Sequence, residues 1–219
     1  MINTVLFDMD GLLLDTEPLW SECMLRIAHQ NGIPITADRF KETTGLRIYE
    51  VTEYWSVKYP WEGKNCREVA EDILEDIIAT SKEKGSILSG VEDALRMLRW
   101  NGFRTGLASS SPSVMIDALV DHFQLRDQFD CITSADEVEL GKPHPAVFLR
   151  CAENLGSRPG ECLVLEDSVN GMIAGKAARM KVLVVPDAAH REDPRFALAD
   201  HQLESLEHLT IDLIRKLSQ

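Results

Sequence analysis

The sequence lacks any long hydrophobic run. No stretch of its 219 residues approaches the ~20 consecutive apolar residues that a transmembrane helix needs. The amino terminus also lacks the basic leader of a signal peptide, and its first apolar run ends at Asp8. A hydrophobic content of 44% and a charged content of 27% are typical of a folded globular chain. These absences exclude a membrane-spanning protein, and we expect no membrane partner.

Paired cysteines are also missing. The five cysteines, at positions 23, 66, 131, 151 and 162, are scattered, and none forms a Cys-x-x-Cys motif. Disulfide frameworks belong mainly to small secreted chains, and structural zinc sites need clustered ligand pairs. We therefore expect reduced thiols, no zinc and a cytoplasmic location.

Basic residues are scarce. Lys and Arg number 23 against 36 Asp and Glu, so the net charge is −13. Because nucleic acids and acidic membranes are polyanions, this balance disfavours both as partners. A small anionic ligand is still compatible with it, provided that a cation lies close to the ligand. We expect a monomer or a weak homodimer.

What the sequence does contain is an alternation of short β-branched runs with helical patterns. This alternation is typical of an α/β protein with a parallel, Rossmann-like sheet covered by helices on both faces. Five strands are predicted, at residues 5–9, 104–108, 131–135, 162–165 and 181–185. A helix over residues 91–101 is expected to end at Gly102, which would be its C′ glycine.

Residues 16–85 read differently from the rest of the chain, because they contain only helical patterns. Val69, Ile73 and Ile77 form one apolar stripe of helical spacing, and acidic residues occupy the opposite face. We predict a core domain of residues 1–15 and 86–219, with residues 16–85 as a helical insert.

Polar residues of the kinds used in phosphate chemistry follow four of the predicted strands. They are Asp8 and Asp10, Ser109, Lys142, and the pair Glu166 and Asp167. The carboxyl ends of parallel strands meet at one edge of a sheet, so we expect these side chains to converge in a single crevice. An Asp-x-Asp pair alone would more often be a strand end with two surface acids; the other strand ends favour a site.

The residue types complement one another chemically. Asp8, Asp10 and Asp167 offer the hard oxygen ligands that Mg²⁺ prefers. Lys142 offers a positive charge for phosphoryl oxygens and for Asp8. Ser109 offers a hydroxyl and, with Ser110, backbone N–H groups at a helix start, where anions bind.

These segments resemble the four motifs of the haloacid dehalogenase superfamily, in order. The matching stretches are Asp8-Met9-Asp10-Gly11 with Asp15-Thr16-Glu17, Leu107-Ala108-Ser109, Lys142-Pro143 and Glu166-Asp167-Ser168. The resemblance covers essentially the whole chain, and it implies that the insert is a helical cap domain and that the cofactor is Mg²⁺.

The resemblance also implies roles for individual residues. Asp8 would be the nucleophile and Asp10 the general acid and base, with Ser109 and Lys142 completing the catalytic set. Asp8, the backbone carbonyl of Asp10, and Asp167 would hold Mg²⁺, supported by Glu166.

The expected substrate-binding residues are Asp8, Met9, Asp10, Ser109, Ser110, Lys142, Arg47 and Trp20. For Arg47 the alternative is a solvated loop arginine. For Trp20, stacking on a sugar ring competes with packing in the cap.

Single residues separate the branches of the superfamily. The dehalogenases have no second aspartate, whereas this chain has Asp10. β-Phosphoglucomutase carries a histidine near the position of Trp20, and an indole cannot shuttle that proton. These differences favour a phosphatase, with a mutase-like isomerase as the alternative enzyme.

Within the phosphatases, the sequence resembles the 2-deoxyglucose-6-phosphate, or hexitol phosphate, phosphatases. The similarity lies at residues 46–48, 165–180 and 193–196. It implies a small phosphorylated carbohydrate, a hexose or hexitol phosphate, as the substrate. A catalytically silent protein that only binds a phosphorylated ligand is the alternative of another class, although such a protein could lose Asp10 freely.

Overall fold

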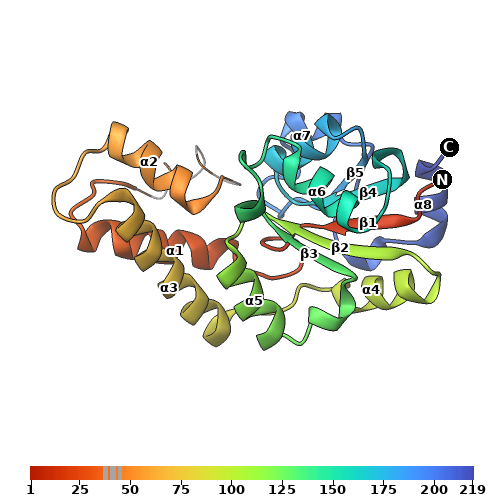
Figure 1. The fold of residues 1–219 in the computed structure, drawn as a ribbon, viewed down its shortest axis with the longest axis horizontal. Helices are drawn as coiled ribbons and strands as arrows, with labels where there is room; N and C mark the ends of the chain where they lie inside the picture. The colour runs from red at the N-terminus through yellow and green to blue at the C-terminus, as the bar shows by residue number, and fades with distance from the viewer. Residues whose placement is uncertain (37–38, 40–42, 44–45) are drawn as a thin grey trace.

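The computed structural model describes residues 1–36, 39, 43 and 46–219. They contain a six-stranded parallel sheet with the strand order β3-β2-β1-β4-β5-β6 (Figure 1). The strands are β1 (Thr4–Phe7), β2 (Arg104–Ser109), β3 (Cys131–Ser134), β4 (Cys162–Glu166), β5 (Lys181–Val184) and β6 (His201–Gln202). The predicted α/β class and parallel sheet are confirmed, but the sheet has one strand more than the five predicted.

The additional strand is β6, which the prediction missed for a physical reason. It has only two residues, His201 and Gln202, and both are exposed and polar. It pairs in parallel with β5 at the edge of the sheet, where Leu183 lies opposite His201. A strand this short has no apolar alternation, so its sequence resembles a loop.

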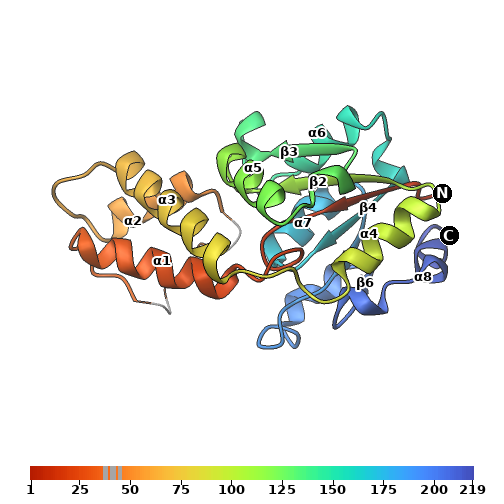
Figure 2. The same cartoon turned by 90° about the horizontal axis from the view of Figure 1, so that it is seen from below.

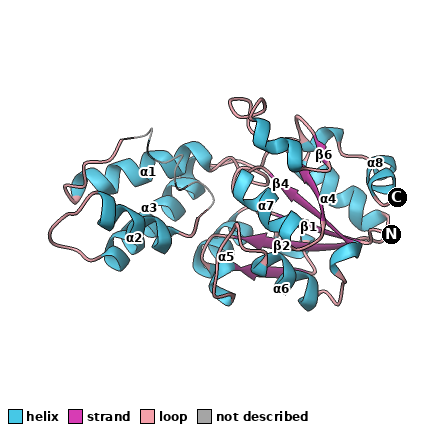
Figure 3. Cartoon of the chain, turned by 90° about the horizontal axis from the view of Figure 1, so that it is seen from above, coloured by secondary structure: helices cyan, strands magenta, loops and turns pink. Residues whose placement is uncertain are grey.

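The two faces of the sheet are both covered by helices, as predicted (Figures 2 and 3). One core contains Val5 and Phe7 of β1 with residues of α4 (Val91–Trp100), α5 (Ser113–His122) and α8 (Ile211–Leu217). The other contains Leu6 with residues of α6 (Ala146–Asn154) and α7 (Val169–Ala177). Successive residues of β1 therefore enter opposite cores, which explains why its sequence is continuously apolar.

Three helices lie beside the sheet, at the end opposite the chain termini (Figure 1). They are α1 (Glu17–Gln30), α2 (Ile48–Lys58) and α3 (Cys66–Lys84), and they bury their own cluster around Trp55. The division into a core and a cap at residues 16 and 85 stays a prediction, which this separate cluster supports. In the described part of the chain, every helix is too short or too polar to cross a membrane.

Short 3-10 helices complete the connections between these elements. They are η2 (Arg126–Gln128), η3 (Ala135–Glu137), η4 (Pro159–Glu161), η5 (Pro194–Leu198) and η6 (Leu206–His208).

Two glycines flank α4 in left-handed backbone conformations. Gly102 has a φ of 76° and follows the C-cap Asn101, which confirms it as the C′ glycine. Gly90, with a φ of 85°, is the N-cap of α4. The two sites differ in their surroundings. A Cβ atom on Gly90 would lie 2.2 Å from the backbone nitrogen of Glu207, whereas one on Gly102 would meet nothing within 4 Å.

We expect alanine to be tolerated much better at Gly102 than at Gly90. Gly102→Ala should lower the free energy of unfolding by about 1–2 kcal/mol, the cost of a left-handed alanine. Gly90→Ala should lower it by roughly 1–3 kcal/mol more, because the neighbouring backbone must also move. Urea unfolding of the two variants measures this difference, and equal midpoints would contradict the steric argument.

Candidate active site

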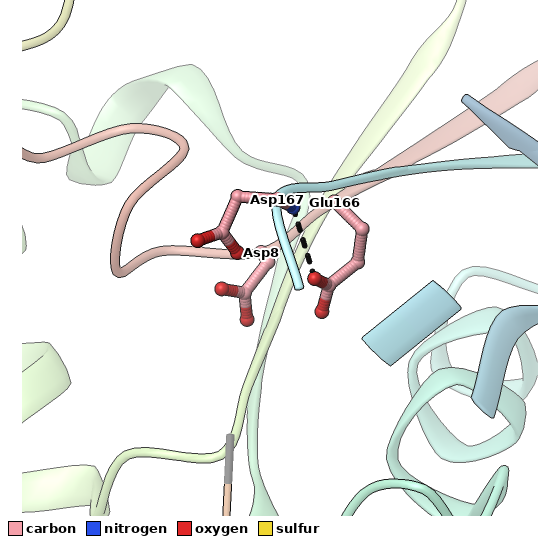
Figure 4. A group of neighbouring side chains, drawn as sticks. All are labelled: Asp8, Glu166 and Asp167. Carbon is pink, nitrogen blue, oxygen red and sulfur yellow. Dashed lines mark hydrogen bonds between the residues drawn. The ribbon is translucent and has the colours of Figure 1, made fainter. Parts of the chain in front are cut away.

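The centre of the candidate site is the carboxyl edge of β1. This strand lies between β2 and β4, and Phe7 is opposite both Leu107 and Leu165. The residues that follow these three positions therefore emerge side by side. Figure 4 shows the carboxylates of Asp8, Glu166 and Asp167 gathered there.

Lys142 is the buried cation of this edge. Its ammonium donates to Oδ1 of Asp8 at 2.5 Å, to Oε1 of Glu166 at 2.7 Å and to the carbonyl of Ala108 at 3.2 Å. Burial alone would lower the pKa of Lys142, but the charges of Asp8 and Glu166 outweigh it and raise that pKa above its usual range. Lys142 therefore stays charged and ties two strand ends together.

Burial and mutual repulsion raise the pKa values of two aspartates at this edge, Asp8 and Asp167. Burial raises the pKa of Asp8 to about 7, although Lys142 opposes the shift, and Glu166 and Asp10 add to it. Burial also raises the pKa of Asp167 well above its usual value, with the charges of Glu166 and Asp8 acting in the same direction. This concentration of negative charge favours a bound cation.

Three carboxylates are close enough together to hold a metal ion. One oxygen each from Asp8, Glu166 and Asp167 lies within 4.8 Å of the others. Both carboxylate oxygens of Glu166 already accept hydrogen bonds, and Oε1 accepts from Lys142. Its other oxygen accepts from the backbone N–H of Asp167 at 3.0 Å, and from the N–H and hydroxyl of Ser168, both at 2.9 Å. The arrangement thus leaves Asp8 and Asp167 as donors for a cation, with Glu166 fixing the turn that carries Asp167.

Asp10 has a different environment, made of hydrogen-bond donors. Its Oδ1 accepts from the hydroxyl of Thr16 at 2.7 Å and from the indole nitrogen of Trp20 at 3.0 Å. Its Oδ2 accepts from the hydroxyl of Ser111 at 2.7 Å. The sequence analysis gave no role to Thr16 or Ser111. Their positions in the sequence could have indicated a role, because Thr16 lies within the motif segment Asp15-Thr16-Glu17 and Ser111 lies two residues after Ser109.

A cavity lies between this edge and the helical insert. The core contributes Asp8, Asp10, Ser109, Ser110, Ser111, Pro112, Lys142, Glu166, Asp167 and Ser168 to its lining. The residues from 17 to 51 that line it are Glu17, Trp20, Ser21, Met24, Thr43, Leu46, Ile48 and Val51. The structure thus brings together most of the expected site residues, and Trp20 is one of them.

Two expected substrate-binding residues lie elsewhere. Arg47 does not line the cavity: its guanidinium is occupied by the Glu50 carboxylate and donates to the carbonyls of Val138 and Glu139. It is therefore a contact between the helical insert and the core, in place of the expected substrate contact or a solvated loop arginine. The side chain of Met9 is fully buried in the core cluster, because the chain alternates faces between Asp8 and Asp10.

Glu17 is a site residue that sequence reasoning did not single out. It opens α1, lines the cavity, and has a pKa raised to about 7 by burial, by Asp10 and by Asp187. Its place in the quoted segment Asp15-Thr16-Glu17 was the available signal. The raised pKa means that the folded protein accommodates this carboxylate poorly when it is ionised.

The fold, the paired acids and the buried lysine define a hydrolase of a known class. The chain belongs to the haloacid dehalogenase-like hydrolases, whose family model matches residues 5–185. It is 44% identical over 210 residues to hexitol phosphatase B of Escherichia coli K12, an alignment that covers 95% of each chain. The resemblance seen in the motifs is therefore confirmed, and the protein is a phosphatase of this family.

Solved structures agree with the fold. The crystal structure of CbbY from Rhodobacter sphaeroides in complex with phosphate is 25% identical, with a TM-score of 0.86, over 95% of this chain and 96% of that one. A β-phosphoglucomutase from Clostridium difficile is also 25% identical, with a TM-score of 0.85, over 100% and 97% of the two chains. The overall fold therefore does not separate a phosphatase from a mutase.

The raised pKa of Glu17 predicts how stability changes with pH in protein kept free of metal by a chelator. Between its usual value of 4.5 and about 7, the folded protein holds the Glu17 proton more tightly than the unfolded chain does. Ionisation therefore lowers stability as the pH rises through this window. Because glutamine cannot ionise, Glu17→Gln should gain stability relative to the wild type between pH 5 and pH 8, by about 1 kcal/mol or more.

Glu22, also on α1, provides the matched control. Hydrogen bonds from Lys84 and Arg26 lower its pKa, so its contribution is complete above its usual value of 4.5. The stability difference between Glu22→Gln and the wild type should then be constant from pH 5 to pH 8. Urea unfolding at several pH values measures both variants, and a constant difference for Glu17→Gln would show that the Glu17 shift is absent.

Proposed function

We propose that this protein hydrolyses the phosphate monoester of a small sugar or polyol, a hexose or hexitol phosphate, with Mg²⁺ as cofactor. The observation that carries the proposal is the cavity in which Asp8 and Asp10 lie side by side in unlike environments. Asp8 contacts a buried cation, whereas the hydrogen bonds to Asp10 within the described part of the chain come from neutral donors on Thr16, Trp20 and Ser111. The contact with Lys142 favours the ionised carboxylate that a nucleophile needs, and the motif resemblance implies the roles of nucleophile for Asp8 and proton donor for Asp10.

In the proposed first step, an oxygen of Asp8 attacks phosphorus and the bond between phosphorus and the sugar oxygen breaks. The proton of Asp10 passes to the departing oxygen, so that an alcohol leaves and an aspartyl-phosphate remains. In the second step, Asp10 takes a proton from water as the water oxygen attacks phosphorus. The bond between phosphorus and the Asp8 oxygen breaks, which releases inorganic phosphate and restores the Asp8 carboxylate. Lys142 and the Ser109 segment bind the phosphoryl oxygens.

The donor set fits Mg²⁺, because Asp8 and Asp167 are hard oxygen ligands that carry more negative charge than Lys142 alone balances. The backbone carbonyl of Asp10 is the further ligand that we propose. A bound Mg²⁺ would favour the ionised form of these carboxylates and stabilise the charge that develops on the transferring phosphoryl group.

The choice of a hexose or hexitol phosphate rests on the similarity to hexitol phosphatase B, which extends over 95% of both chains. The cavity is compatible with such a substrate. The strand ends line it with polar and charged residues, and the helical insert adds the apolar residues Met24, Leu46, Ile48 and Val51 to the lining. These apolar residues can pack against the carbon chain of a sugar while the phosphate lies at Lys142.

A mutase is the second candidate, because β-phosphoglucomutase has the same fold. Trp20 argues against it: the indole that replaces the expected histidine bonds to Asp10, and it cannot pass a proton to the sugar. Among the described residues that line the cavity, Lys142 is also the only Lys or Arg, which disfavours a bisphosphate intermediate. A silent binding protein is disfavoured because the complete set Asp8, Asp10, Lys142 and Asp167 is present.

Phosphate release from a panel of sugar and polyol phosphates tests the proposal. We expect hexitol or hexose 6-phosphates to be hydrolysed in the presence of Mg²⁺, and exhaustive chelation to abolish the activity. The panel includes β-glucose 1-phosphate with a bisphosphate primer. Its conversion to glucose 6-phosphate without phosphate release would identify a mutase, and binding without turnover of any substrate would identify a silent binding protein.

The nucleophile is tested by Asp8→Asn, which removes the attacking carboxylate and leaves the shape unchanged. We expect kcat to fall by roughly 10³ or more. Asp15→Asn is the matched control, because Asp15 is exposed and does not line the cavity, and it should leave kcat unchanged. Full activity of Asp8→Asn would exclude an aspartyl-phosphate at this residue.

A further inference from the structure

Trp20 occupies the junction between the helical insert and the core. It is half-buried and packs against both the sheet core and the cluster around Trp55. Its indole nitrogen nevertheless points at a polar partner, Oδ1 of Asp10, at 3.0 Å. Trp20 lies one helical turn after Thr16, whose carbonyl accepts from the backbone N–H of Trp20 and whose hydroxyl reaches the same oxygen at 2.7 Å. The N-cap and the first turn of α1 therefore present two donors to a single carboxylate oxygen.

The two oxygens of Asp10 consequently differ in whether their hydrogen-bond partners allow them to carry a proton. An indole N–H is a donor only, so its partner Oδ1 must be an acceptor without a proton. The partner of Oδ2 is the Ser111 hydroxyl, at 2.7 Å. A hydroxyl can donate to a carboxylate and, after rotation, accept from a carboxylic acid. Oδ2 can therefore carry the proton while Thr16 and Trp20 keep their hydrogen bonds to Oδ1.

We propose that Trp20 is a positioning residue for proton transfer: its indole N–H holds Oδ1 and so orients the carboxyl group of Asp10, leaving Oδ2 to deliver the proton to the leaving oxygen. This inference rests on the proposed phosphatase function and adds a role that neither sugar stacking nor cap packing includes. In the step concerned, the bond between Oδ2 and hydrogen breaks, the proton joins the sugar oxygen, and that oxygen leaves phosphorus with its electron pair.

The proposal predicts a loss that depends on the leaving group. An alkyl alcohol is a poor leaving group and needs the proton, whereas p-nitrophenolate leaves without one. The indole N–H bonds to a carboxyl group that becomes charged as its proton leaves, and losing such a hydrogen bond changes a rate by about tenfold or more. Trp20→Phe, which removes the N–H and keeps an aromatic ring, should therefore lower kcat/KM by about tenfold for hexitol phosphate, and by less than about twofold for p-nitrophenyl phosphate. The value of kcat/KM is compared because it reports the step in which the alcohol leaves.

The experiment measures kcat and KM of the Mg²⁺-loaded enzyme for p-nitrophenyl, phenyl and hexitol phosphates. Trp61→Phe is the matched control: it removes another indole N–H close to α3, one that donates to the carbonyl of Lys64 at 2.7 Å, far in the chain from Asp10. This control should leave all three substrates unaffected. A second variant replaces Trp20 by β-(3-benzothienyl)alanine, which exchanges the N–H for sulfur at nearly constant shape and so preserves folding. It should show the same selective loss as Trp20→Phe.

Two results would overturn the role of Trp20. An equal loss for all three substrates in both Trp20 variants would mean that Trp20 only packs the cap. A loss for hexitol phosphate in Trp20→Phe that is absent from the benzothienyl variant would mean that Trp20 stacks on the sugar. Failure of the phosphatase proposal is distinguishable from both, because the wild type would then release phosphate from none of the substrates.

Discussion

The buried ammonium of Lys142 is the contact on which the site depends. Two carboxylates from different strand ends, Asp8 and Glu166, share this one cation. Ionised groups are costly to bury, so each member of the triad is tolerable only because the others are present. Glu166 in turn accepts the N–H groups that begin the turn before α7, and this turn carries Asp167. The same charges thus organise the backbone and leave Asp8 and Asp167 facing each other beside the cavity.

The helical insert supplies part of the environment of the second acid, Asp10. The contacts of Asp8 come from the core, whereas Asp10 is hydrogen-bonded by both parts of the structure. Thr16 and Trp20 of the insert donate to one oxygen of Asp10, and Ser111 of the core donates to the other. The two acids therefore differ through their neighbours. One lies beside a cation and a second acid, and the other lies among neutral donors. Contacts such as Arg47 with the carbonyls of Val138 and Glu139 also fasten the insert to the core, away from the cavity.

Particular elements show where sequence reasoning succeeds. The five longer strands were predicted because their apolar runs enter two cores, and Gly102 was predicted because a helix end needs a left-handed residue. The convergence of Asp8, Ser109 and Asp167 followed from parallel topology alone. The failures were local. The strand β6 has no apolar residue, so no pattern predicted it. Arg47 lies next to two residues that line the cavity, and its position in the sequence did not reveal that its guanidinium bonds to Glu50 and to two backbone carbonyls.

The sequence by itself determined the fold class and the family and predicted the edge that carries the candidate site, because strand periodicity and motif order are properties of the chain that need no coordinates. Only the tertiary structure decided the partners of each acid. Hydrogen bonds such as that from Trp20 to Asp10 depend on the angle at which α1 leaves the core, and no spacing in the sequence encodes that angle. The same is true of Glu17, whose raised pKa arises from burial and from Asp187, 170 positions later in the chain. Chemistry at this site is set by side chains that long-range packing brings together.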